Sequence, residues 1–94
     1  MNRETVVERL NAHAGELRAQ GVSAIHLFGS MARDGARRGS DVDLFFDYDD
    51  PMIGLVRVSN RIGAILRVEA DVMTRDSLHP RLKERIEASA ARVF

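Results

Sequence analysis

Two short motifs follow one another closely in the sequence: Gly29-Ser30-Met31-Ala32-Arg33 and Ser40-Asp41-Val42-Asp43-Leu44. The second motif opens a run of strand-forming residues, and side chains two positions apart on a strand leave the same face. We therefore expect Asp41 and Asp43 on one face, roughly 7 Å apart along the strand. Two carboxylates this close repel each other unless a cation lies between them. They suit Mg²⁺, which proteins usually bind through one or two carboxylates together with substrate phosphates.

The first motif is suited to binding those phosphates. Gly29 allows the backbone to approach a ligand closely, and Ser30 supplies a hydroxyl. The short helix expected over residues 30–37 would direct free N–H groups at an anion. Arg33 lies one turn into this helix, within reach of the same phosphates.

The spacing of the two motifs resembles that of the nucleotidyltransferase superfamily, which includes DNA polymerase beta and the aminoglycoside nucleotidyltransferases. The small single-domain group called minimal nucleotidyltransferases (MNT) is the most similar. A later run, Ala70-Asp71-Val72-Met73-Thr74-Arg75-Asp76-Ser77-Leu78, also resembles that group, so the likeness covers most of the chain. Asp34 departs from the family pattern, which commonly has Gly there, and adds negative charge near the proposed phosphate site.

This resemblance implies a complete set of site residues. Asp71 matches the third carboxylate of the family, which ligates the catalytic metal and in many members takes the proton from the attacking hydroxyl. Glu69, two residues away on the same face of the expected strand, is the alternative; the family pattern and the shorter side chain favour Asp71. The implied catalytic residues and ligands of two Mg²⁺ ions are Asp41, Asp43 and Asp71, and the residues implied to bind ATP are Gly29, Ser30 and Arg33.

Length and composition narrow the class of protein. With 94 residues the chain is expected to form a single domain, residues 1–94. Its 14 basic and 14 acidic residues cancel, so no basic surplus indicates a nucleic-acid partner, which counts against a polymerase-like role. No apolar run approaches the roughly 20 residues of a membrane helix, and the first residues lack a signal-peptide core. We expect a cytoplasmic protein, in agreement with the absence of cysteine.

The remaining pattern predicts an α/β (α+β) fold. Helices are expected over residues 5–20, 30–37, 53–67 and 81–94, and strands over 22–28, 41–47 and 68–73. The resemblance implies the mixed sheet of the polymerase-beta palm, with helices packed mainly on one face. The last helix is expected to bury one stripe of apolar residues: Leu82, Ile86, Ala90 and Val93.

Several polar residues are expected to have structural roles. His26, inside the first strand, is predicted to be a half-buried, hydrogen-bonded histidine, and proximity to the nucleotide is the alternative. His79 is expected to have a structural role at the start of the last helix. The acids after the second strand are interpreted as capping or solvated residues before metal ligands: Asp47, Asp49 and Asp50.

No segment remains to bind an acceptor, so the acceptor is expected on another protein. The resemblance implies an antitoxin of a toxin–antitoxin pair whose partner is a HEPN-domain ribonuclease, and AMPylation of a tyrosine of that toxin. Two alternatives remain. One is an inert module that blocks the toxin by contact, which the intact acids disfavour. The other is an enzyme that modifies a small molecule such as an aminoglycoside, which the short length disfavours.

Overall fold

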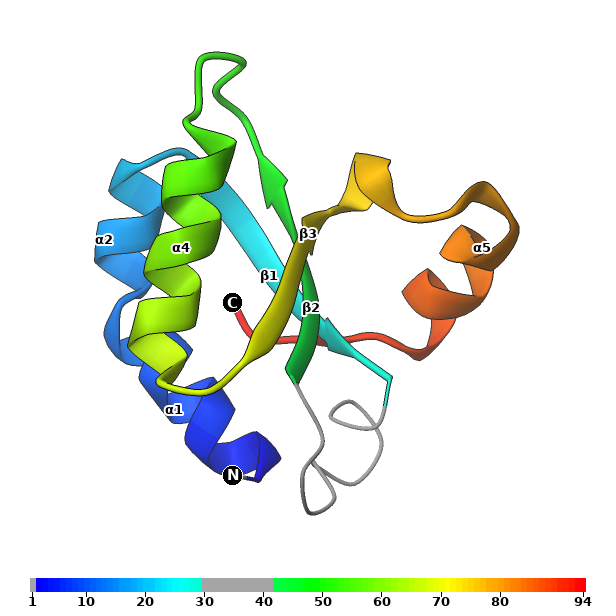
Figure 1. Cartoon of the computed structure of the whole chain (residues 1–94), viewed down its shortest axis with the longest axis horizontal. Coiled ribbons are helices and arrows are strands. Elements are labelled where there is room, and N and C mark those ends of the chain that lie inside the picture. The colour runs from blue at the N-terminus through cyan, green and yellow to red at the C-terminus, as the bar shows by residue number, and fades with distance from the viewer. Residues whose placement is uncertain (1, 30–41) are drawn as a thin grey trace.

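A four-stranded mixed sheet forms the centre of the computed structural model, which describes residues 2–29 and 42–94 (Figure 1). The strands are β1 (Val22–Phe28), β2 (Val42–Tyr48), β3 (Ala70–Thr74) and β4 (Ala91–Arg92), in the order β3-β2-β1-β4. β1 pairs antiparallel with β2 and β4, whereas β2 and β3 are parallel. The predicted mixed α/β fold is confirmed. The helix expected over residues 30–37 lies outside the described residues.

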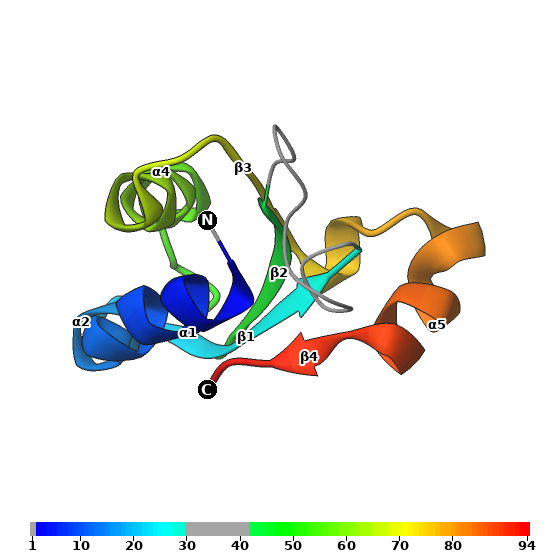
Figure 2. The ribbon, with the colours of Figure 1, turned by 90° about the horizontal axis from the view of Figure 1, so that it is seen from below.

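Helices cover the sheet unequally. α1 (Arg3–Ala12), α2 (Ala14–Ala19) and α4 (Leu55–Leu66) lie on one face, and α5 (Pro80–Ser89) stands on the other side (Figure 2). A parallel pair requires a crossover connection, and α4 supplies it between β2 and β3. Of the described helices, none is both long and apolar enough to cross a membrane.

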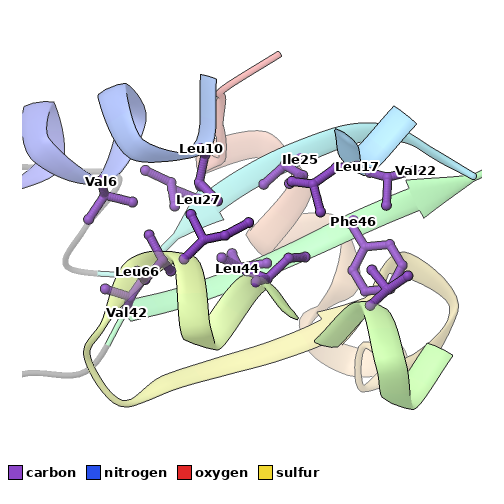
Figure 3. Close-up of a cluster of buried hydrophobic side chains, with 13 residues drawn as sticks. Val6, Leu10, Leu17, Val22, Ile25, Leu27, Val42, Leu44, Phe46 and Leu66 are labelled. Atoms are coloured by element: carbon purple, nitrogen blue, oxygen red, sulfur yellow. The ribbon is translucent and has the colours of Figure 1, made fainter. Parts of the chain in front are cut away.

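Strict alternation along β2 assigns its side chains to two different environments. Val42, Leu44 and Phe46 face the three-helix layer, where they join a buried apolar cluster with residues of β1 and the helices (Figure 3). Asp43 and Asp47 therefore point to the opposite face. Because a slip by one residue would exchange these two sets, burial of the first set determines where the acids point.

The N-terminal half of the fold differs in detail from the prediction. The helix expected over residues 5–20 is two helices, α1 and α2, with a break at His13. α4 begins at Leu55 after Gly54, without a side-chain cap. Asp50 instead accepts a hydrogen bond from the Met52 N–H within the preceding turn, at 2.9 Å. Capping by an acid was therefore the wrong interpretation of this turn.

The helix expected over residues 81–94 is wrong in its last five residues, 90–94. α5 ends at Ser89, and the chain then forms β4 beside β1. The Val93 N–H donates to the Ile25 carbonyl at 2.7 Å, so the free edge of β1 supplies hydrogen bonds that a helical pattern does not reveal. α5 itself buries no residue, and Leu82 is 48% exposed.

Candidate active site

Two acids lie side by side on the face of the sheet opposite the three-helix layer. Asp43 of β2 pairs in register with Asp71 of β3. Paired residues of neighbouring parallel strands are about 4.8 Å apart and point to the same side. Asp71 is exposed and Asp43 half-buried. Glu69, the alternative third acid, precedes the first residue of β3.

Gly29 belongs to the same end of the sheet. It follows β1 directly and has a φ of 69°, in the left-handed region that favours glycine. A Cβ placed on it would lie 3.0 Å from Oδ2 of Asp43. Glycine at this position therefore lets the chain pass close to the carboxylate and leaves space beside it.

Further along β2 from Asp43, aromatic and charged side chains form a cluster on the same face of the sheet as the acids. Phe45 is fully buried, although it lies outside the main core. The His26 ring stacks on it at 4.9 Å between centroids and 15° between planes, and the Phe28 ring lies at 5.9 Å. The Arg75 guanidinium covers the Phe45 ring at 4.8 Å from its centroid.

Arg75 opens the short 3-10 helix η1 (Arg75–Ser77) directly after β3, and its guanidinium is hydrogen-bonded to both β2 and α5. Its Nε and Nη2 donate to the two carboxylate oxygens of Asp47 at 2.7 and 2.9 Å, and Nη1 donates to Glu87 of α5. Hydrogen bonding from Arg75 lowers the pKa of Asp47, and the same bonds raise the pKa of Arg75. Asp47 is thus the last acid of β2 and is ion-paired, so interpreting it as a cap or a solvated residue was wrong.

Known proteins are similar to this chain in sequence and in fold. The family model for the nucleotidyltransferase domain matches residues 10–93. The chain belongs to this family. It is 34% identical over 86 residues to a Methanocaldococcus jannaschii protein named "Putative protein adenylyltransferase MJ0126", covering 87% of this chain and 88% of the relative.

Two solved structures are similar to this nucleotidyltransferase. A "putative minimal nucleotidyltransferase" superposes with a TM-score of 0.80 at 30% identity, covering 97% of this chain and 95% of the other. A chain from a mutant of the toxin–antitoxin complex MntA–HpeT superposes with a TM-score of 0.64 at 14% identity. The match covers 100% of this chain and 73% of the other. The first comparison confirms that the chain is a minimal nucleotidyltransferase domain; the second shows the shared fold alone.

Of the six predicted site residues of the nucleotidyltransferase, the structure brings three together: Gly29, Asp43 and Asp71. The other three, Ser30, Arg33 and Asp41, lie outside the described residues. Sequence reasoning missed Arg75 and Glu87. A basic residue directly after a strand that carries an acid was the only available signal for Arg75, and none pointed to its partners.

A divalent cation fits the side chains of this site. Asp43 and Asp71 offer neighbouring carboxylate oxygens, the ligands that Mg²⁺ prefers. The space beside Asp43 is one that a Cβ on residue 29 would fill. Within residues 2–29 and 42–94 no group of three metal-binding side chains comes together, and the third predicted ligand, Asp41, is not among these residues.

Replacing Gly29 by alanine should disturb both the fold and the acid site. The left-handed backbone costs an L-residue roughly 1–2 kcal/mol, and the new methyl group would press on the Asp43 carboxylate. We expect a comparable loss in the free energy of unfolding, measured in urea, together with reduced nucleotide transfer. Gly63→Ala is the matched control because the added Cβ would meet no atom within 4 Å beyond the backbone of its own helix and its chain neighbours. In mid-helix it should stabilise the fold by about 0.5–1 kcal/mol.

His26 should make the fold less stable in mild acid. Its Nδ1 is buried, has no hydrogen-bond partner among the described residues, and lies 4.0 Å from Oδ2 of Asp47. The prediction of a hydrogen-bonded histidine was therefore wrong for this nitrogen. Burial, followed by the charge of Arg75, lowers the pKa of His26 from 6.5, against the opposing effect of Asp47.

The sign of the pH effect follows from this shift. Below pH 6.5 the unfolded chain binds a proton at residue 26 more readily than the folded chain does, so acid favours unfolding. We expect the free energy of unfolding to fall between pH 7.5 and 5.5, measured in urea. His26→Phe keeps a ring on Phe45 and removes the titrating group, so its profile should be flatter; an equally steep profile would contradict the assignment.

Proposed function

We propose that this nucleotidyltransferase transfers AMP from ATP to a tyrosine hydroxyl of a HEPN-type toxin, with Mg²⁺ as cofactor, and so acts as an antitoxin. The observation that carries the proposal is the in-register pair Asp43 and Asp71, on neighbouring strands and beside Gly29. A relative 34% identical is named as a protein adenylyltransferase, and a toxin–antitoxin complex contains a chain of the same fold. Both support a protein as acceptor.

In this proposal the acids bind the metal ions and the glycine motif binds the phosphates. Asp41, Asp43 and Asp71 would hold two Mg²⁺ ions, which supply charge neutralisation for the phosphates and acidify the acceptor hydroxyl. The Gly29 backbone and the side chains of Ser30 and Arg33 bind the β- and γ-phosphates and leave the α-phosphorus open to in-line attack. This binding turns the reaction with a docked acceptor into an effectively intramolecular one.

Proton transfer completes the proposed reaction. Asp71 accepts the proton of the tyrosine hydroxyl as the hydroxyl oxygen attacks the α-phosphorus. One oxygen–phosphorus bond forms, the bond between the α-phosphorus and the bridging oxygen breaks, and pyrophosphate leaves with the electron pair. Asp71 is exposed at the edge of the sheet, where a second protein can reach it.

Mass spectrometry of a candidate toxin tests the proposal. The product of the neighbouring gene, incubated with this protein, ATP and Mg²⁺, should gain the mass of one or more AMP groups on tyrosine. A tight complex without any gain in mass would identify an inert antitoxin module instead. Labelling of a small hydroxyl compound such as an aminoglycoside, and not of the toxin, would identify a small-molecule enzyme.

A further inference from the structure

We propose that Arg75 is a positioning residue, which keeps Asp71 beside Asp43 by locking the end of β3 onto β2. The inference rests on the proposed function of the acid pair. It concerns a side chain that neither the motifs nor the family resemblance assign to the site.

Arg75 lies at the end of the β2–β3 ladder, where a side-chain contact can hold β3 in its register with β2. The β2–β3 ladder ends with the pair Phe46 and Thr74. The next residues along the chain are Asp47, still in β2, and Arg75, the first residue after β3. They are joined by two hydrogen bonds of 2.7 and 2.9 Å between guanidinium and carboxylate. A side-chain pair thus extends the backbone ladder by one position. Such bidentate pairs add geometric specificity as well as energy, because both planar groups must align.

The Arg75 guanidinium also rests on the residue between the two acids of β2. Phe45 lies on the acid-bearing face between Asp43 and Asp47, is fully buried, and has the guanidinium 4.8 Å from its ring centroid. Arg75 therefore contacts two successive residues of the face that also carries Asp43. A displacement of Arg75 would move the strand that carries Asp71 relative to this face.

The strand that carries Asp71 needs such a restraint. β3 has five residues, lies at the edge of the sheet, and pairs only with β2 among the described strands. Parallel pairing is slightly weaker per residue than antiparallel pairing. A slip of one residue would turn Asp71 away from Asp43, and even smaller errors of position are costly, since misplacement by about 1 Å can cost about 100-fold in rate.

The test compares Arg75→Lys with Arg61→Lys. Lysine keeps the charge and removes the planar, two-pronged contact. Arg61 is a matched control because it makes the same kind of pair with Glu16, at 2.5 and 2.8 Å, in the helical layer on the other face. We expect Arg75→Lys to lower kcat by about 10- to 100-fold with little change in KM for ATP, and Arg61→Lys to leave kcat unchanged.

Hydrogen exchange supplies a readout that does not depend on activity. Amides of β3 should exchange faster in Arg75→Lys than in the wild type, and those of β1 should not. Glu87→Gln removes the negative charge that α5 presents to Arg75 and leaves the pair with Asp47 in place, so it should speed exchange in α5 and leave kcat near the wild-type value. Asp47→Asn removes the charge and one of the two acceptor oxygens that Arg75 binds, so it should reproduce both effects of Arg75→Lys. It serves as the second variant where Arg75→Lys folds poorly.

The outcomes separate this inference from the proposed function. Wild-type kcat and wild-type β3 exchange in folded Arg75→Lys or Asp47→Asn would overturn the positioning role. An equal loss of kcat in Arg61→Lys would also overturn it, because the effect would then be one of general stability. If the wild type transfers no AMP while β3 exchange rises only in the Arg75 and Asp47 variants, the proposed function fails. The role of Arg75 in holding β3 against β2 is then still supported.

Discussion

Asp43→Asn is expected to abolish nucleotide transfer and to leave the fold nearly intact. Asparagine keeps the shape of the side chain and removes the negative charge that a bound cation needs. Asp43 faces away from the apolar core, on the same side as Asp71, so the substitution removes no core packing. The loss should be about 1,000-fold or more, the scale seen when a residue of a catalytic unit is removed.

Two measurements on matched variants check this expectation. AMP incorporation is followed with saturating ATP and Mg²⁺, and urea unfolding shows whether the variant is folded. Asp49→Asn is the control, because it is the same chemical change at a distance from the acid pair. Asp49 is exposed and lies just beyond the end of β2. Transfer near the wild-type rate in folded Asp43→Asn would contradict the proposed mechanism.

Asp71→Asn should be nearly as damaging, whereas Glu69→Gln should have little effect. Both acids were expected on one face of the third strand. The structure starts β3 at Ala70, and Asp71 is the acid in register with Asp43. The Glu69 backbone still contacts β2, since its carbonyl accepts from the Val42 N–H at 3.3 Å. Substituting the Glu69 side chain leaves that bond in place.

The pH dependence of the rate adds a second criterion for Asp71. If its carboxylate takes the proton from the acceptor, Asp71→Asn should lower kcat by about 100- to 10,000-fold and flatten the acidic limb of the rate profile. Glu69→Gln should keep that limb. A strong loss in Glu69→Gln together with an active Asp71→Asn would reverse the assignment of the third acid.

Local pattern was sufficient to place the acid of β2 on the face of the sheet opposite the core. Val42, Leu44 and Phe46 lie at every second position of β2, so their burial in the core directs Asp43 to the other face. Gly29 was recognisable from the motif that follows the first strand, and the structure gives it a left-handed backbone beside the Asp43 carboxylate. The resemblance to minimal nucleotidyltransferases then selected Asp71, since spacing within one strand cannot show which other strand lies beside it.

Other features depended on contacts that no local pattern contains. Asp47 resembles a cap when only its neighbours in sequence are considered, but its partner Arg75 lies 28 positions away and reaches it only after β3 has paired with β2. Val93 continues a helical stripe, but the free edge of β1 draws residues 91–92 into a strand.

The sequence by itself determined the alternation that turns Asp43 away from the core, and with it the chemistry available at that face. Only the tertiary structure decided that Asp71 lies opposite Asp43 and that Arg75 joins β2, β3 and α5. The physical reason is that side-chain periodicity is a property of each strand alone. Register and ion pairing arise between segments, where hydrogen bonds and charges far apart in the chain come within reach.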